Sequence, residues 1–229
     1  GGGAFAGPSP FTGQGSILTG PDFDSPQALV DGLPTSNHDH GVNGLEFDHN
    51  GDLLICMGGN TNAGVKHLAM GDLDESPLSG AILKALTSRS DFNGSVVYLD
   101  RTTGNPVSDQ VLAEDTDVAP GVHVFSYAHG LRNGFDLALT TSGSLYATDN
   151  GPNYGYGLES TGPNSDTGSH ANDDDELLWI EEGSYYGHAN RSRGFSDPRQ
   201  YVYRDVVEPE TGSFSQHMIE LAASVNGIK

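Results

Sequence analysis

Residues whose types could do chemistry are concentrated between positions 127 and 187. Residues 127–133 end in Gly-Leu-Arg-Asn, 148–153 contain Asn-Gly-Pro, 173–176 are four carboxylates, and 185–187 read Tyr-Tyr-Gly. An arginine at a turn, a Gly-Pro pair at a strand end and a carboxylate cluster before a Tyr-Gly are groups that loops bring together. These residue types predict a loop-built site for an anionic cofactor held with a metal ion.

A second group of candidates lies earlier, where residues 37–44 read Asn-His-Asp-His-Gly-Val-Asn-Gly. Imidazole has an ordinary pKa of about 6.5, which suits proton transfer near neutral pH. On its own, His40 is more typical of a turn histidine that hydrogen-bonds its own loop. His38 and His40 are two residues apart and would share one face of an extended strand, where a third ligand would make a transition-metal site.

The negative net charge of the chain argues against anionic partners. The 229 residues include 31 Asp and Glu but only 10 Lys and Arg, for a formal net charge of −21. Such a surface repels phosphate backbones and anionic lipid head groups, so we expect no nucleic-acid partner. The carboxylates favour calcium, a hard cation that prefers oxygen ligands. Because no apolar run is long enough to cross a bilayer, the sequence also predicts no membrane span.

Compartment signals are few. Two sequons, Asn93-Gly94-Ser95 and Asn190-Arg191-Ser192, lie in turn-like sequence and suit a secreted glycoprotein, so we expect an extracellular location.

Cys56 is the single cysteine and lies in an apolar run, which predicts a buried structural thiol. The chain begins Gly-Gly-Gly-Ala-Phe without an initiator methionine or a signal pattern, which indicates a processed or excised segment.

The elements that must position these residues are short. The 32 glycines and 12 prolines predict many turns and few long helices. Ile82, Leu83 and Leu86 have helical spacing and predict one short helix over residues 79–87. Apolar segments bounded by Gly, Asn, Asp or Ser predict strands at 44–48, 52–57, 95–100, 122–127, 135–139, 144–148 and 176–181.

A weak internal repeat supports a particular arrangement of these strands. Residues 45–55 align with 135–147 around Gly51 and Gly143, each as two strands joined by a tight polar turn. The offset is about two blades of a propeller, whose four-stranded blades recur every roughly 40 to 50 residues. We therefore predict an all-β fold, a β-propeller of four-stranded blades that is incomplete in this chain. Residues 1–36 are expected to be an irregular Gly/Pro-rich lead-in and 37–229 a partial propeller.

An open propeller leaves unpaired strand edges, which aggregate unless they are covered. We therefore expect further propeller blades, or another chain, to close the sheet edges.

Taken together, these segments resemble the soluble glucose/sorbosone dehydrogenase family, including its Hedgehog-interacting-protein-like relatives. The resemblance runs from about residue 37 to residue 186. It implies a propeller that binds pyrroloquinoline quinone (PQQ) with calcium and oxidises an aldose at C1 by hydride transfer to the quinone. It also implies that His40 is the general base for the C1 hydroxyl proton.

The remaining site residues are also implied by the resemblance. Arg132 would donate hydrogen bonds to the quinone oxygens, with Asn133 and Asn150 contacting the cofactor. The alternative for Arg132 is a structural arginine paired with a surface carboxylate.

The metal ligands follow from the same resemblance. Gly151 and Pro152 would give carbonyl oxygens to the cofactor's calcium, although Asn-Gly-Pro is also an ordinary turn. Glu176 and the carbonyl of Tyr186 would help bind a structural calcium. The alternative for the carboxylate run 173–175 is a solvated loop.

Three departures from the family pattern bear on function. Gly59 stands where an aspartate commonly orients the catalytic histidine, Gly44 where an arginine is often found, and His188-Ala189 where Trp-Pro often follows Tyr-Gly. After Gly187 nothing matches the basic residues that clamp the PQQ carboxylates. Two hypotheses therefore remain: a PQQ sugar dehydrogenase, or a catalytically silent extracellular propeller that is stabilised by calcium and binds a glycan or assembles with other proteins.

Overall fold

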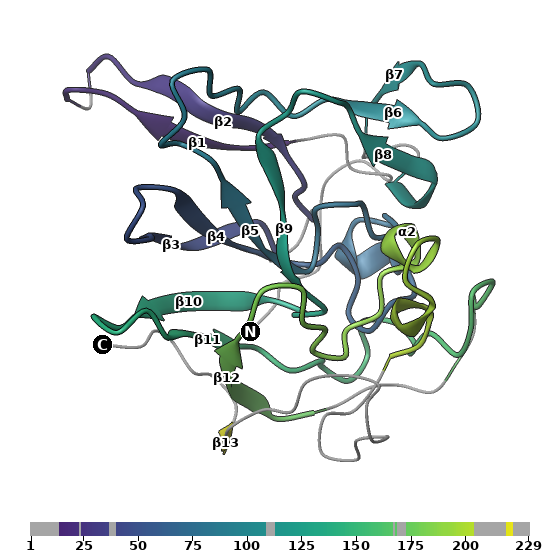
Figure 1. Cartoon of the computed structure of the whole chain (residues 1–229). Helices are drawn as coiled ribbons and strands as arrows, with labels where there is room; N and C mark the ends of the chain where they lie inside the picture. Colours follow the sequence, from purple (N-terminus) through teal and green to yellow (C-terminus); the bar gives the residue numbers. More distant parts are fainter. Residues whose placement is uncertain are drawn as a thin grey trace.

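The structure is a computed structural model and describes residues 14–22, 24–36, 40–108, 113–166, 168, 173–203 and 219–221. It is built mainly of short antiparallel strands in four small sheets, and helices are few and short (Figure 1). The all-β prediction is confirmed. Among the described residues the sheets do not close into a ring.

Two four-stranded antiparallel sheets form the centre of the molecule and lie one above the other in Figure 1. In each sheet, strands that follow one another in sequence are neighbours in space. The first sheet has the order β3 (Val42–Phe47), β4 (Leu53–Met57), β5 (Ala81–Ala85) and β9 (Val124–His129). The second has the order β10 (Gly134–Leu139), β11 (Leu145–Asp149), β12 (Asp175–Ile180) and β13 (Ile219–Leu221).

Smaller elements surround these sheets. Strands β1 (Gly15–Thr19) and β2 (Gln27–Leu33) pair as a hairpin, and β6 (Tyr98–Asp100) pairs with both β7 (Pro106–Val107) and β8 (Thr116–Val118). The helical pieces are η1 (Leu68–Met70), η2 (Ala113–Asp115), α2 (Arg191–Gly194) and η3 (Pro198–Tyr201). No helix in the described part of the chain is long and apolar enough to cross a membrane.

The first sheet is covered on both faces, and this explains its composition. Strand β4 is buried along its whole length, with alternate residues entering different clusters. Leu53, Ile55 and Met57 pack with the β1–β2 hairpin and β6, whereas Leu54 and Cys56 pack against the second sheet. A strand with one face in solvent alternates apolar and polar residues, whereas a strand buried on both faces, such as β4, is apolar throughout.

The two central sheets approach closely. An added Cβ on Gly44 in β3 would be 2.7 Å from the Cα of Asp136 in β10. The glycine is therefore required by the spacing of the sheets, and no arginine would fit at this position. Apolar residues of both sheets fill the space between them: Leu54, Cys56, Ile82, Ala128, Leu137, Leu145, Ala147, Leu178 and Ile180.

The helix predicted over residues 79–87 is wrong, because this segment forms strand β5. Ala81, Leu83 and Ala85 face one core cluster and Ile82 faces the other, so the apolar spacing reflects burial on both faces. The lead-in, predicted to be irregular, contains the β1–β2 hairpin in its described portion. The strand predicted at 95–100 begins only at Tyr98.

The paired turns predicted from the repeat are present. The β3–β4 and β10–β11 hairpins turn at Gly51 and Gly143, whose φ angles are +84° and +90°. Glycine adopts this left-handed conformation without the steric cost that a Cβ brings. The sequence repeat therefore corresponds to two equivalent hairpins in successive sheets.

Two other local predictions have different outcomes. Cys56 is fully buried, as predicted for a structural thiol, and burial raises its pKa well above the ordinary value. Asn93 of the first sequon is exposed. Asn190 of the second is buried, and its side chain caps α2 by accepting from the Arg193 N–H. The second sequon is therefore inaccessible to glycosylation in the folded protein.

Candidate functional site

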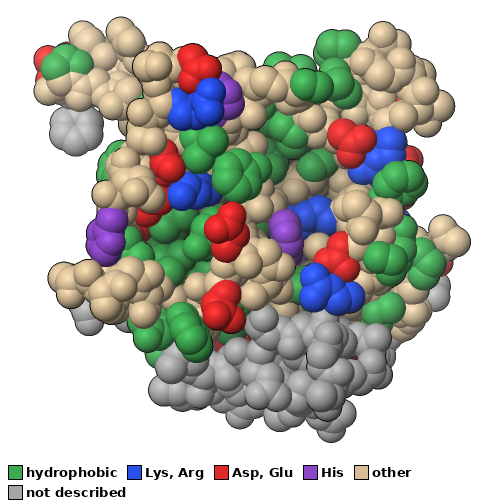
Figure 2. Space-filling view, viewed as in Figure 1, with side chains coloured by type: hydrophobic (Ala, Val, Ile, Leu, Met, Phe, Trp, Pro, Cys, Tyr) green, Lys and Arg blue, Asp and Glu red, His purple; other side chains and the backbone are tan. Residues whose placement is uncertain are grey.

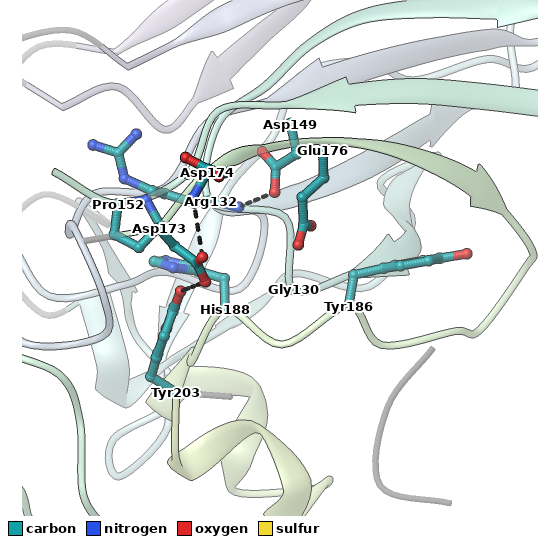
Figure 3. A pocket seen from close by; sticks show the side chains of 11 residues that line it. Gly130, Arg132, Asp149, Pro152, Asp173, Asp174, Glu176, Tyr186, His188 and Tyr203 are labelled. Carbon is teal, nitrogen blue, oxygen red and sulfur yellow. Dashed lines mark hydrogen bonds between the residues drawn. The ribbon is translucent and has the colours of Figure 1, made fainter. Parts of the chain in front are cut away.

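Loops at one end of the two central sheets enclose a small cavity (Figure 3). The cavity volume, counted as the space that the centre of a water molecule can occupy, is about 20 Å³. This is enough for one water molecule or one metal ion. Five residues predicted from the sequence line it: Arg132, Gly151, Pro152, Glu176 and Tyr186. The other lining residues are Gly130, Asp149, Asp173, Asp174, His188 and Tyr203.

Arg132 is fixed in the loop between β9 and β10. The carboxylate of Asp149, at the end of β11, accepts hydrogen bonds from the backbone N–H of Arg132 at 2.9 Å and of Asn133 at 2.7 Å. Burial raises the pKa of Asp149 to about 6, although these two hydrogen bonds favour its ionised form. The β9–β10 loop is thereby tied to the second sheet.

The guanidinium of Arg132 points into the protein. Arg132 is 4% exposed, and its Nε donates to the carbonyl and side-chain oxygens of Asn62 while Nη1 donates to the carbonyl of Asn150. This burial places the guanidinium away from the surface, where the alternative would have it pair with a carboxylate, and its contacts with Asn62 and Asn150 also suit a structural arginine. Asn133 and Asn150 lie beside it, with the Nδ2 of Asn133 3.3 Å from Oδ1 of Asn150.

The carbonyl and carboxylate groups are arranged around the Asn-Gly-Pro turn. Asp175 accepts from the Gly151 N–H at 3.0 Å and from the Asn150 side chain at 3.2 Å, and the Pro152 carbonyl accepts from the Asp173 N–H. Asp175 is buried, so the carboxylate run is not simply a solvated loop. Among the described residues, no group of three His, Cys, Asp or Glu side chains could hold a metal by itself. A calcium here would therefore need main-chain oxygens, which both predicted calcium sites include. The residues predicted for the two sites, Gly151 with Pro152 and Glu176 with Tyr186, line this one cavity.

His40 lies next to this cavity but does not line it. Gly58 separates it from Asn133, since an added Cβ on Gly58 would be 2.8 Å from the His40 Cβ and 2.7 Å from Oδ1 of Asn133. The imidazole is 3% exposed, and burial followed by the charge of Arg132 lowers its pKa well below 6.5. His40 is therefore neutral at neutral pH. His38 lies outside the described residues.

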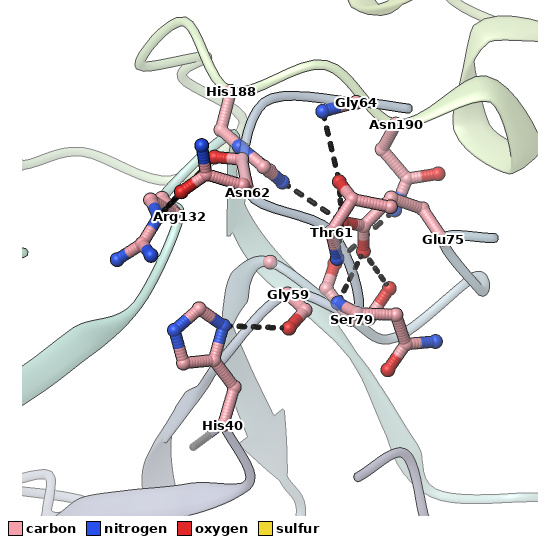
Figure 4. Close-up of polar contacts among 12 residues, drawn as sticks. His40, Gly59, Thr61, Asn62, Gly64, Glu75, Ser79, Arg132, His188 and Asn190 are labelled. Carbon is pink, nitrogen blue, oxygen red and sulfur yellow. Dashed lines mark hydrogen bonds and ion pairs between the residues drawn. The ribbon is translucent and has the colours of Figure 1, made fainter. Parts of the chain in front are cut away.

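The ring of His40 has a defined orientation. Its Nδ1 is 2.8 Å from the carbonyl oxygen of Gly59, which accepts only, so Nδ1 carries the proton. The other ring nitrogen, Nε2, points away from Gly59 and keeps its lone pair (Figure 4). Gly59 stands where the resembled family commonly has the aspartate that orients the histidine, and in this chain the main-chain carbonyl of Gly59 defines the tautomer. The partner is also 19 residues away rather than in the histidine's own loop.

Glu75 and His188 form a buried pair that the sequence did not indicate (Figure 4). The His188 Nε2 is 2.8 Å from Glu75 Oε1, and the two side chains are 2% and 1% exposed. Burial by itself would raise the pKa of Glu75. Hydrogen bonds from His188, Ser79 and Thr61 outweigh this effect and lower the pKa to about 2. The only sequence signal was His188 in place of the family's tryptophan, because Glu75 lies in a polar loop without a motif.

A larger groove opens at the opposite ends of the same strands, between the β3–β4 and β10–β11 hairpins (Figure 2). Its volume on the same measure is about 290 Å³. Leu54, Leu139 and Leu145 line it together with Asp48, Lys84 and Glu182. None of the predicted site residues lies there, so the candidate site remains at the Arg132 end.

A scan against protein-family models and a search of curated proteins found no match to this chain.

Proposed function

We propose that the chain is part of a calcium-dependent, PQQ-dependent sugar dehydrogenase that oxidises an aldose at C1. The observation that supports this most is the grouping of Arg132, Gly151, Pro152, Glu176 and Tyr186 around one cavity, with His40 beside it. These residues come from the β9–β10 loop, the turn after β11, the start of β12 and the segment after β12, and each was predicted from the sequence as a site residue. The family assignment rests on the sequence resemblance.

The proposed fold is a β-propeller of the soluble glucose/sorbosone dehydrogenase type. Two consecutive four-stranded antiparallel sheets that pack face to face agree with two neighbouring blades. Further blades, or another chain, would close the open strand edges. An extracellular or secreted location is part of the same proposal, and the exposed Asn93 sequon agrees with it.

His40 has the properties of a general base in this scheme. It is neutral, its Nδ1 proton is held by Gly59, and the lone pair on Nε2 is the group that would accept the C1 hydroxyl proton of the sugar. Bound PQQ would supply the quinone carbon that accepts the hydride. Arg132, a buried permanent cation, would stabilise negative charge that develops on the quinone oxygen.

The cavity fits calcium better than it fits the whole cofactor. Asp149, Asp173, Asp174 and Glu176 line a space for one ion, and carboxylate oxygens suit a hard cation. PQQ carries three carboxylates, and the lining residues Asp149, Asp173, Asp174 and Glu176 would repel them. Among the described residues that line the cavity, Arg132 and His188 are the only basic side chains. The lining residues therefore fit the calcium and do not supply the clamp for the carboxylates.

This mismatch favours a second candidate function, a calcium-stabilised extracellular module that binds a glycan or assembles with other proteins. Titration with PQQ in the presence and absence of millimolar calcium separates the two candidates. The dehydrogenase should bind PQQ tightly with a shift of its visible band, and should then reduce a dye when an aldose is added. Calcium binding without PQQ binding would favour the module.

A further inference from the structure

The peptide group between Gly59 and Asn60 connects His40 to a buried carboxylate. Its carbonyl oxygen accepts from Nδ1 of His40 at 2.8 Å, and its N–H donates to Oε2 of Glu75 at 3.0 Å. The imidazole, one peptide unit and the carboxylate thus form a continuous chain of hydrogen bonds. Figure 4 shows His40 and Glu75 on opposite sides of this turn.

Glu75 is built into this position as an ionised group. Besides Asn60, it accepts hydrogen bonds from the backbone N–H and hydroxyl of Thr61, the hydroxyl of Ser79 and the ring of His188. Five donors around one buried carboxylate stabilise its negative charge. The charge of Glu75 also favours the protonated form of His40.

Glu75 also occupies the space that a side chain at position 59 would need. An added Cβ on Gly59 would be 2.9 Å from Oε1 of Glu75, 2.9 Å from Nε2 of His188 and 3.1 Å from the Arg132 carbonyl. A carboxylate at position 59 is therefore excluded by packing. The carboxylate of Glu75, which comes from another loop, occupies the space next to Gly59 instead.

We propose that Glu75 is a positioning residue for His40 and acts on it through the Gly59–Asn60 peptide. A carboxylate that accepts from the N–H of a peptide polarises that peptide and makes its carbonyl a stronger acceptor. The stronger bond holds the Nδ1–H tautomer and stabilises the imidazolium that forms when Nε2 takes a proton. The catalytic part of this inference rests on the proposed dehydrogenase function, whereas the hydrogen-bond relay does not.

A purely structural role for Glu75 makes a different prediction. The loop after Glu75 is also anchored by Arg193, which donates to the carbonyls of Pro77, Ser79 and Gly80, and by Asn190, which donates to those of Ser76 and Ser79. If Glu75 only closed this loop, its charge would not affect the His40 ring once the loop was in place. The test therefore needs a readout at His40 itself.

The experiment compares Glu75→Gln with Ser79→Ala by NMR of the full chain labelled with ¹⁵N-histidine. Glu75→Gln removes the charge with little change of shape, and Ser79→Ala removes one donor to Glu75 but keeps the carboxylate. Loss of a resonance in His40→Gln assigns the Nδ1 proton. We expect this proton to move upfield in Glu75→Gln and to stay near its wild-type position in Ser79→Ala.

Kinetics give the second readout. In dye reduction with PQQ, calcium and an aldose, Glu75→Gln should lower kcat about 10- to 100-fold and leave KM within about twofold. If Glu75→Gln does not fold, Glu75→Asp withdraws the carboxylate from Asn60 while keeping its charge, and should also move the Nδ1 proton upfield.

An unchanged Nδ1 resonance in a folded variant overturns the relay, and an unchanged kcat in an active enzyme overturns the catalytic role of Glu75. A wild type without any dye reduction overturns the dehydrogenase assignment alone, because the NMR comparison still decides the relay.

Discussion

The imidazole of His188 and the carboxylate of Glu75 are 2.8 Å apart in the interior of the protein, although 113 residues separate them in sequence. The pair joins the loop after β4 to the segment after β12, and so links the two central sheets on the side of the candidate site. Removal of His188 takes away one of the five donors to the buried Glu75 carboxylate, and a buried charge that loses a partner is destabilising.

The first prediction concerns the stability that this pair provides. His188→Phe keeps a ring but removes the nitrogen that contacts Glu75, and should lower the free energy of unfolding by about 3 kcal/mol. Urea denaturation at pH 7 measures this. Asp91→Asn, which breaks the exposed ion pair with Arg89, is the control and should leave stability unchanged. Equal small effects in the two variants would contradict the assigned importance of the buried pair.

The second prediction is a pH dependence that originates at Glu75. Its pKa in the folded protein is about 2 and its ordinary value is 4.5, so the unfolded chain binds the proton more readily. The stability that Glu75 contributes is therefore complete above pH 4.5 and is lost as the pH falls towards 2. Glu75→Gln should be less stable than wild type at pH 7 but lose less stability between pH 4.5 and 2. Parallel stability curves over that range would refute this origin.

The third prediction tests the close approach of the two sheets at Gly44. Gly44→Ala places a methyl group 2.7 Å from the Cα of Asp136, where backbone atoms have to move. We expect a loss of about 1 to 3 kcal/mol in unfolding free energy. Gly162→Ala, where an added Cβ meets nothing within 4 Å, is the matched control. Wild-type stability in Gly44→Ala would mean that β3 and β10 are farther apart than described.

Much of the strand pattern could be predicted from sequence, because short apolar segments between Gly, Asn and Asp form strands in both central sheets. Residues 79–87 were one exception, because Ile82 and Leu83 of the doubly buried strand β5 are followed by the half-buried Leu86 just after the strand, and the three together have helical spacing. The β1–β2 hairpin was missed because Gly and Pro around it obscured two short strands.

For the candidate site, motifs identified Arg132, Gly151, Pro152, Glu176 and Tyr186, which converge on one cavity. Motifs did not identify Glu75, because its role depends on which loop fills the space next to Gly59, and that packing is three-dimensional information. The sequence also has a glycine at position 59, where the resembled family commonly has the aspartate that orients the histidine. The carbonyl of that same glycine is the group that orients the ring.

The fourth prediction concerns the proposed calcium. Calcium at 100 times its dissociation constant should raise the free energy of unfolding by about 2.7 kcal/mol, because it binds only the folded protein. Glu176→Gln removes a charged oxygen ligand from the cavity and should abolish most of this gain. Glu182→Gln, which lies in the larger groove, should keep it. Thermal unfolding with calcium or with EDTA measures the difference, and an equal response of both variants would place the ion elsewhere.

The most direct test of the proposed function is the rate of aldose-dependent dye reduction by wild type and His40→Gln, both supplied with PQQ and calcium. If Nε2 of His40 accepts the C1 hydroxyl proton, kcat should fall at least about 100-fold in the variant while PQQ affinity is retained. Equal rates in the two proteins would contradict the assignment of His40 as the base.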